Sequence, residues 1–154
     1  MIKITLPKSY YWYIIAIIVA PMLIFLEYMT GYICIILSGN TPRGISVNKY
    51  WQRQNIIITI FIILIALFEE LIFRKIWFDI LSSSFGFSIL ATILLTSLIY
   101  GLNHLYFGIY TVLQKIISGA LLGTLFCLSG GSVAISFIAH GLENLLISVI
   151  GGEQ

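Results

Sequence analysis

Residues 68–74 read Phe-Glu-Glu-Leu-Ile-Phe-Arg and place three charged side chains inside an otherwise apolar segment. The preceding residues 56–67 read IIITIFIILIAL, a composition typical of a membrane-spanning helix. A charged side chain near the bilayer centre costs about 2.5 to 3.5 kcal/mol on insertion scales, so three of them need partners, a water-filled cavity or a function. The stretch therefore predicts a transmembrane helix that carries a functional site.

The spacing of these charges separates their roles. Glu70 and Arg74 are four residues apart on a helix, with the acid on the N-terminal side, which is the order that an intrahelical ion pair prefers. We expect the two to neutralise each other and to support the packing of the helix. Glu69 lies about 100° around the helix from Glu70, so it cannot contact Arg74 as Glu70 does. Glu69 is therefore the candidate working carboxylate.

The composition excludes most soluble functions. Of the 154 residues, 60% are hydrophobic and only 9% are charged, and the mean hydropathy is +1.06, which together indicate an integral membrane protein of one domain. The net charge of +2 comes without any basic cluster, so nucleic acid is not an expected partner. Cys34 and Cys127 lie in apolar segments without metal-binding spacing and are interpreted as small buried hydrophobic residues.

The apolar runs predict an all-α transmembrane bundle of about five spans. Residues 1–54 would form an N-terminal span and a polar interfacial loop over 38–54, and residues 55–154 a four-helix core. Glu27, toward the end of the first span, is expected near a membrane interface. The basic residues divide too evenly between the two sides to orient the protein. The five spans are expected at residues 10–37, 55–81, 85–106, 110–128 and 132–150.

Two further polar motifs lie in the predicted spans. Tyr100-Gly101-Leu102-Asn103-His104 falls in the third span, and His140-Gly141-Leu142-Glu143-Asn144 falls in the fifth. The chain has only two histidines, and both are in these motifs. His140 and Asn144 are one helical turn apart, so their side chains can point at a common atom, with Glu143 close beside them. We expect Glu69, His104, His140 and Asn144 to converge on one cavity among the last four spans.

The three motifs, in this order on successive spans, resemble the CPBP family of intramembrane proteases, also called the CAAX protease and bacteriocin-processing, or Abi, family. The resemblance covers about residues 56–150 and implies the family's four-helix catalytic core. Three residues depart from the family pattern. Tyr100 stands where Phe is usual, Lys75 where Gly often follows the Arg, and Glu143 where the family usually has a neutral residue.

The resemblance implies an intramembrane endopeptidase in a prokaryotic cell membrane, acting on a membrane-associated protein or peptide. By that resemblance, Glu69 with His104 activates the attacking water, and His140 with Asn144 stabilises the oxyanion. Glu70 and Arg74 are similar to the family's supporting pair. The expected mechanism requires no cofactor, but Glu69, His104 and His140 could also hold a divalent metal such as zinc.

The sequence leaves other functions open. A non-enzymatic immunity or partner-binding protein would also carry buried polar residues, and a proton-coupled carrier can use intramembrane Glu and His as a relay. The chain shows neither an inverted repeat nor a pair of interrupted helices, which disfavours the carrier. For a protease, the substrate could be a prenylated CAAX-type protein, a bacteriocin or peptide precursor, or a C-terminal sorting tail with a membrane anchor.

Overall fold

The computed structural model describes residues 5–7, 9–40 and 54–150. All regular secondary structure within these residues is helical, which confirms the predicted all-α class. The elements are α1 (Tyr11–Leu37), α2 (Ile56–Glu70), η1 (Leu71–Ile76), α3 (Trp77–Asp79), η2 (Ile80–Ser84), α4 (Ile89–Leu102), η3 (Leu105–Phe107), α5 (Ile109–Leu128) and α6 (Val133–Ile150).

Helix length and composition agree with a membrane bundle. Three helical segments are long and apolar enough to cross a bilayer: Tyr11–Leu37, the continuous rod Ile56–Ser84 and Ile109–Leu128. Two shorter apolar helices, α4 and α6, complete the bundle. The third span, predicted at residues 85–106, is shorter in the structure, where α4 begins at Ile89 and ends at Leu102. Most of the predicted interfacial loop, residues 41–53, lies outside the described residues.

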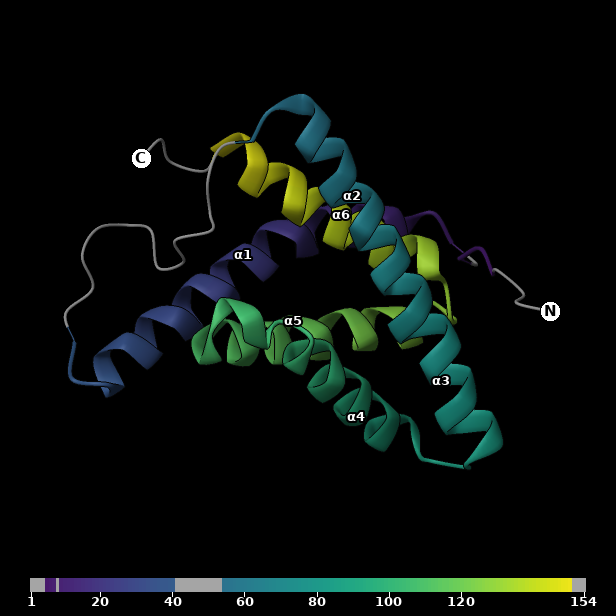
Figure 1. Ribbon diagram of the computed structural model, residues 1–154. Helices are drawn as coiled ribbons and strands as arrows, with labels where there is room; N and C mark the ends of the chain where they lie inside the picture. Colours follow the sequence, from purple (N-terminus) through teal and green to yellow (C-terminus); the bar gives the residue numbers. More distant parts are fainter. Residues whose placement is uncertain (1–4, 8, 41–53, 151–154) are drawn as a thin grey trace.

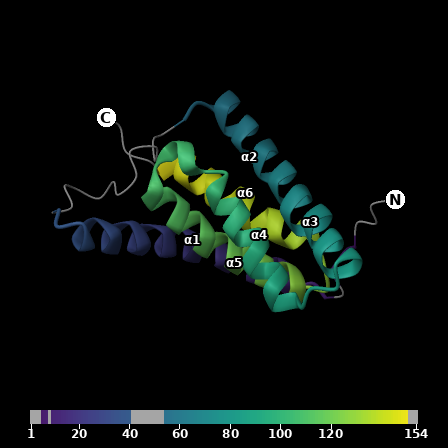
Figure 2. The same ribbon diagram turned by 60° about the horizontal axis from the view of Figure 1, so that its bottom comes forward.

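The helices are arranged with α5 and α6 between α1 and the rod that α2 begins (Figure 1). α1 packs against both α5 and α6, α2 packs against α6, and α4 packs against α5. After rotation of the view, α4, α5 and α6 are again seen between α1 on one side and the α2–α3 rod on the other (Figure 2). Residues far apart in the sequence therefore meet around α5 and α6.

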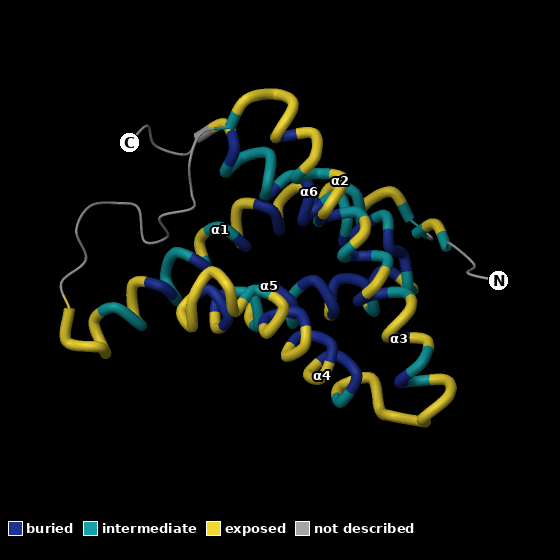
Figure 3. Tube along the Cα trace, viewed as in Figure 1, coloured by how far each residue is buried: buried dark blue, intermediate teal, exposed yellow. Residues whose placement is uncertain are grey.

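Burial follows this arrangement (Figure 3). The sides of the helices that face one another are buried, and large apolar side chains such as Phe61 and Phe68 point outward from α2. In water this exposure of apolar side chains would be unfavourable, but a helix surface that contacts lipid tails is expected to be apolar. The outward residues therefore mark the surface expected to contact the bilayer.

Short polar residues and glycines fix where the helices begin. The side chain of Asn55 accepts a hydrogen bond of 2.9 Å from the Ile58 amide and caps α2, and Ser88 caps α4 through the Ala91 amide at 3.3 Å. Gly130 and Gly131 adopt φ values of 80° and 79°, which only glycine tolerates readily, and turn the chain from α5 into α6.

The rod from Ile56 to Ser84 changes its winding directly after the acidic pair. α2 ends at Glu70, and a π-helical segment, η1, begins at Leu71 and contains Arg74. Wider π turns inside α-helices are rare and occur frequently at functional sites. The rod is therefore irregular where its charges are.

α4 and α5 approach closely because small residues lie at their contact. A Cβ on Gly101 would lie 2.8 Å from the Val112 carbonyl oxygen, and a Cβ on Gly119 would lie 3.0 Å from the Tyr100 ring. Small residues permit this close backbone approach in membrane bundles. The contact holds the end of α4, and with it Tyr100, against α5.

Candidate active site

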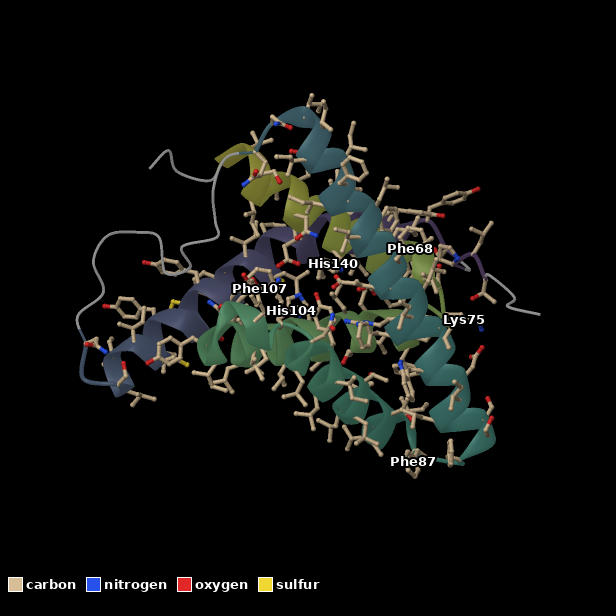
Figure 4. The ribbon with its side chains drawn as sticks, in the orientation of Figure 1. Phe68, Lys75, Phe87, His104, Phe107 and His140 are labelled. Atoms are coloured by element: carbon tan, nitrogen blue, oxygen red, sulfur yellow. The ribbon has the colours of Figure 1, made fainter. Side chains whose placement is uncertain are left out.

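Glu69 is in the last turn of α2 and lies between the two histidines. Its Oε1 is 3.8 Å from Nε2 of His104, and its Oε2 is 3.8 Å from Nε2 of His140. One imidazole comes from α6 and the other from the turn after α4, and the two approach each other in the middle of the bundle (Figure 4). The side chain of Glu69 is 16% exposed, whereas that of Glu70 is completely buried.

His104 follows the C-terminus of α4, in the turn that leads to η3 and α5. Its Nδ1 lies 2.9 Å from the carbonyl oxygen of Tyr100. A carbonyl oxygen can only accept, so Nδ1 carries the proton and Nε2 of the neutral ring is an acceptor. In the neutral ring, the unprotonated nitrogen of His104 thus faces Glu69.

His140 lies in the middle of α6 and is 2% exposed. Its Nδ1 is 3.0 Å from Oε1 of Glu70, and its Nε2 is 3.3 Å from the hydroxyl of Tyr100. The carboxylate accepts the Nδ1 hydrogen, because a carboxylate oxygen is an acceptor. Both ring nitrogens of His140 therefore have partners, and the ring is held in one orientation.

The Glu70–Arg74 pair predicted from the spacing is present. Arg74 Nε lies 3.3 Å from Glu70 Oε2, with both side chains almost completely buried. The contact is electrostatic rather than a hydrogen bond, because neither Arg74 Nε nor Glu70 Oε2 has a hydrogen-bond partner. Arg74 also donates to the Gly119 carbonyl oxygen at 3.2 Å and lies 4.9 Å over the Tyr100 ring. The pair thus links the rod to α4 and α5.

Tyr100 contacts more of this site than the sequence motif suggested. Its ring packs edge-on against Phe73 and His104, its carbonyl oxygen holds His104, and its hydroxyl reaches His140. Tyr100 is completely buried. The only sequence signal was its place four residues before His104, which gave no indication that its hydroxyl would meet a residue of α6.

Asn144 is one turn after His140 on α6 and is partly buried. Its backbone oxygen accepts from Ser148, whereas no hydrogen bond to its side-chain amide is found among the described residues. Of the four predicted site residues, the structure thus brings Glu69, His104 and His140 into contact distance and places Asn144 next along α6.

The donors at this site do not form a metal-ligand set as they stand. Within residues 5–7, 9–40 and 54–150, no group of three or more His, Cys, Asp or Glu side chains is arranged to hold a metal ion. His140 Nε2 is directed to the Tyr100 hydroxyl as well as to Glu69.

Glu27, which was expected near a membrane interface, is buried between α1 and α5. Glu27 is 1% exposed and contacts Lys115 of α5 at 2.6 Å. Lys115 also lies 3.6 Å from Glu143, so that a second group of buried charges is present beside the first. The sequence contained a usable signal, because both Glu27 and Lys115 stand in apolar runs, where a charge needs a partner.

Comparison with known protein families assigns the chain. A family model described as type II CAAX prenyl endopeptidase Rce1-like matches residues 51–146, more than half of the chain. The chain belongs to this Rce1-like family. No curated protein and no solved structure gives a significant match.

Membership of the Rce1-like family agrees with the resemblance seen in the motifs and implies an endopeptidase that acts at the membrane. The matched residues contain Glu69, Glu70, His104, His140 and Asn144. They exclude α1, although α1 packs against α5 and α6. The match to the Rce1-like family model thus covers the α2 rod, α4, α5 and most of α6.

Proposed function

We propose that this Rce1-like protein hydrolyses a peptide bond within the membrane, using a water molecule activated by Glu69. The position of the Glu69 carboxylate supports the proposal, because each of its oxygens faces Nε2 of one histidine at 3.8 Å. Such a gap exceeds a direct hydrogen bond, and polar groups at this spacing are commonly bridged by water. The carboxylate would act as the general base.

His104 would orient the water. Its Nε2 is an acceptor because Nδ1 donates to the Tyr100 carbonyl oxygen. A water between Glu69 and His104 would direct one hydrogen at each of them and keep an oxygen lone pair free for the substrate carbonyl carbon. Glu69 takes a proton from the water as the water oxygen attacks. It then passes this proton to the nitrogen of the leaving amine as the peptide C–N bond breaks, and Glu69 is a carboxylate again.

His140 and Asn144 would stabilise the oxyanion that forms as the carbonyl becomes tetrahedral. His140 Nδ1 donates to Glu70, so Nε2 can donate only when the ring is doubly protonated. The adjacent Glu70 carboxylate stabilises that positive charge. Glu70 is thus a positioning residue for His140 as well as the partner of Arg74.

The substrate would be a protein or peptide segment held at the membrane. The family description names a CAAX prenyl endopeptidase, which favours a prenylated C-terminal segment as the first substrate to test. Peptide precursors and membrane-anchored sorting tails are the other candidates. Vesicles that contain the purified protein and one labelled substrate of each class would separate them by the appearance of cleaved product.

The decisive experiment compares the wild type with Glu69→Gln in such vesicles. We expect Glu69→Gln to abolish cleavage while the protein remains folded, because the amide cannot accept the water proton. Asp79→Asn is the matched control, since Asp79 is an exposed acid on the same rod that pairs with Lys75. Full cleavage by folded Glu69→Gln protein would refute the mechanism. A cellular phenotype that survives this substitution without any cleavage would favour a binding role.

Metal dependence is tested on the same preparation. We expect active protein to retain cleavage after dialysis against a chelator, because the proposed base, donors and nucleophile come from side chains and water. Loss of cleavage that zinc restores, together with bound zinc in the active protein, would replace this mechanism by a metal-dependent one.

A further inference from the structure

A second group of buried charges joins three helices outside the proposed active site. It consists of Glu27 from α1, Lys115 from α5 and Glu143 from α6. Lys115 Nζ lies 2.6 Å from Glu27 Oε1 and 3.6 Å from Glu143 Oε1. Glu27 is 1% exposed and Glu143 is completely buried. We call these three residues the Glu-Lys-Glu cluster.

The two carboxyl groups of the cluster are bonded unequally. Glu27 Oε1 accepts from Lys115 and, at 2.7 Å, from the hydroxyl of Ser118, while its backbone oxygen accepts from Gln114 at 2.7 Å. Glu27 Oε2 has no hydrogen-bond partner. Neither oxygen of Glu143 has one either, because 3.6 Å from Lys115 is too long. Buried polar atoms without partners are rare and require an explanation.

The charges of the cluster do not balance if both acids are ionised. Two carboxylates and one ammonium would leave a net negative charge, buried where charged groups are strongly disfavoured. When two carboxyl groups share a site, one of them holds its proton more tightly. Glu27 Oε1 and Glu143 Oε1 face the same Lys115 ammonium at 2.6 Å and 3.6 Å, so the two carboxyl groups are neighbours and a proton on one can be donated to the other. A single proton would thus satisfy the charge balance and the unpartnered oxygens together.

We propose that the Glu-Lys-Glu cluster is a proton-binding site, in which Glu143 holds a proton at neutral pH and donates it to Glu27 Oε2. Glu143 is the protonated member because Lys115 and Ser118 already donate to Glu27 and stabilise its charge. The cluster then contains one carboxylate, one ammonium and one neutral carboxyl group, with no net charge.

The groups around Glu143 do not supply a second counter-charge. On its own helix the nearest titratable group is His140, and on α4 it is Tyr100. When His140 is doubly protonated, its charge is matched by Glu70 at 3.0 Å and by Glu69 at 3.8 Å. Lys115 is thus the cation available to the cluster among the described residues.

The cluster gives α1 a defined connection to the matched core. α1 lies outside residues 51–146, yet it supplies the carboxylate that Lys115 and Ser118 bind. A protonated Glu143 also places no negative charge beside His140 and Asn144. Related proteases usually have a neutral residue at this position, and a protonated Glu143 is also neutral. Its side chain therefore differs from theirs less than a carboxylate would.

Infrared spectroscopy of the purified protein in lipid bilayers tests the proposal directly. A protonated carboxyl group has a C=O stretching band separate from that of a carboxylate, and the band shifts when hydrogen is exchanged for deuterium. We expect such a band from the wild type at neutral pH. We expect it to disappear in Glu143→Gln and in Glu27→Gln, because in the latter Glu143 becomes the sole partner of Lys115 and ionises.

Asp79→Asn is the control, since this exposed acid pairs with Lys75 and its loss should leave the band unchanged. Absence of the band from the wild type, a measurement that needs no variant, would overturn the proposal. Persistence of the band in Glu143→Gln would also overturn it. If Glu143→Gln does not fold, persistence of the band in Glu27→Gln is the corresponding result. The band should remain in inactive Glu69→Gln protein, which keeps this test separate from that of the protease mechanism.

Discussion

Glu70 of α2 and His140 of α6 are seventy residues apart in the sequence and share a buried hydrogen bond of 3.0 Å. The other oxygen of the same carboxylate lies 3.3 Å from Arg74 Nε. Glu70 thus connects the ion pair that stabilises the rod to the histidine proposed to receive the oxyanion. Stability and activity should therefore both depend on it.

Replacement of Glu70 by Gln should lower both stability and cleavage. Removing one partner of a buried ion pair leaves the other charge uncompensated, which typically costs about 3 to 5 kcal/mol. Cleavage should fall further than the loss of folded protein explains, because Gln cannot stabilise a doubly protonated His140. The measurements are unfolding in detergent and the specific activity of the folded fraction.

The pair formed by Lys75 and Asp79 is the matched control for Glu70. It has the same four-residue spacing on the same rod, but Asp79 is 54% exposed. Exposed pairs contribute below about 1 kcal/mol, so Asp79→Asn should change stability little and cleavage not at all. Equal losses in Glu70→Gln and Asp79→Asn would show that burial and the bond to His140 do not matter.

Tyr100→Phe isolates the hydroxyl that contacts His140. The substitution keeps the ring that packs on Phe73 and Arg74 and the carbonyl oxygen that binds His104. We expect a folded protein with a lowered kcat and an unchanged KM, because only the partner of His140 Nε2 is lost. Tyr100→Leu, which also removes the ring, should reduce stability as well. An unchanged kcat in Tyr100→Phe would show that the hydroxyl does not position His140.

Gly101→Ala should disrupt the contact between α4 and α5. The added Cβ would lie 2.8 Å from the backbone oxygen of Val112, which cannot move without shifting α5. Overpacking of this kind costs about 1 to 3 kcal/mol. Cleavage should also fall, because the Gly101 carbonyl oxygen accepts from the backbone amide of His104 at 2.9 Å.

Gly141→Ala is the control for this effect of size. Gly141 is also helical, but a Cβ there would meet its nearest neighbour, the Phe137 ring, at 3.4 Å, which is an ordinary contact. We expect its unfolding midpoint to stay close to that of the wild type. A larger loss in Gly141→Ala than in Gly101→Ala would contradict the importance of the α4–α5 contact.

The fold class and the approximate helix positions were predictable because they depend on local composition. Apolar runs of span length and the polar residues that interrupt them are visible in one sequence, as at residues 56–74. The order of the three motifs along the chain also indicated which polar residues belong to one site. The end of the third span was less predictable, since Leu105, Tyr106 and Phe107 continue the apolar pattern although α4 ends at Leu102.

Contacts between helices could not be predicted from the sequence. The hydrogen bond from Tyr100 to His140 and the sharing of Lys115 by two acids depend on which helices are neighbours and how they are rotated. The change from α-helix to π-helix at Leu71 could not be predicted either, because the hydrophobic pattern expected of a helix assumes 3.6 residues per turn throughout. These features determine the chemistry of the site, whereas the sequence determines which side chains are available to it.

The relative effects of His104→Ala and Asn144→Ala test the division of roles at the proposed site. His104 would hold the attacking water with Glu69, and loss of acid-base catalysis costs about 10²- to 10⁴-fold in rate. Asn144 would be one of two oxyanion donors, and removal of one such donor costs about 10²- to 10³-fold. We therefore expect His104→Ala to abolish detectable cleavage and Asn144→Ala to leave a measurable residue.

Both variants should fold, because His104 is partly exposed and no hydrogen bond to the Asn144 side chain is found within the described residues. Single-turnover cleavage in vesicles, with excess protein over a labelled substrate, measures the chemical step without product release. In Asn144→Ala the rate of that step should fall while substrate binding is unchanged, since an oxyanion donor acts only in the transition state. The reverse order, with Asn144→Ala the more damaging, would place the water on the α6 side of Glu69 and assign its orientation to His140.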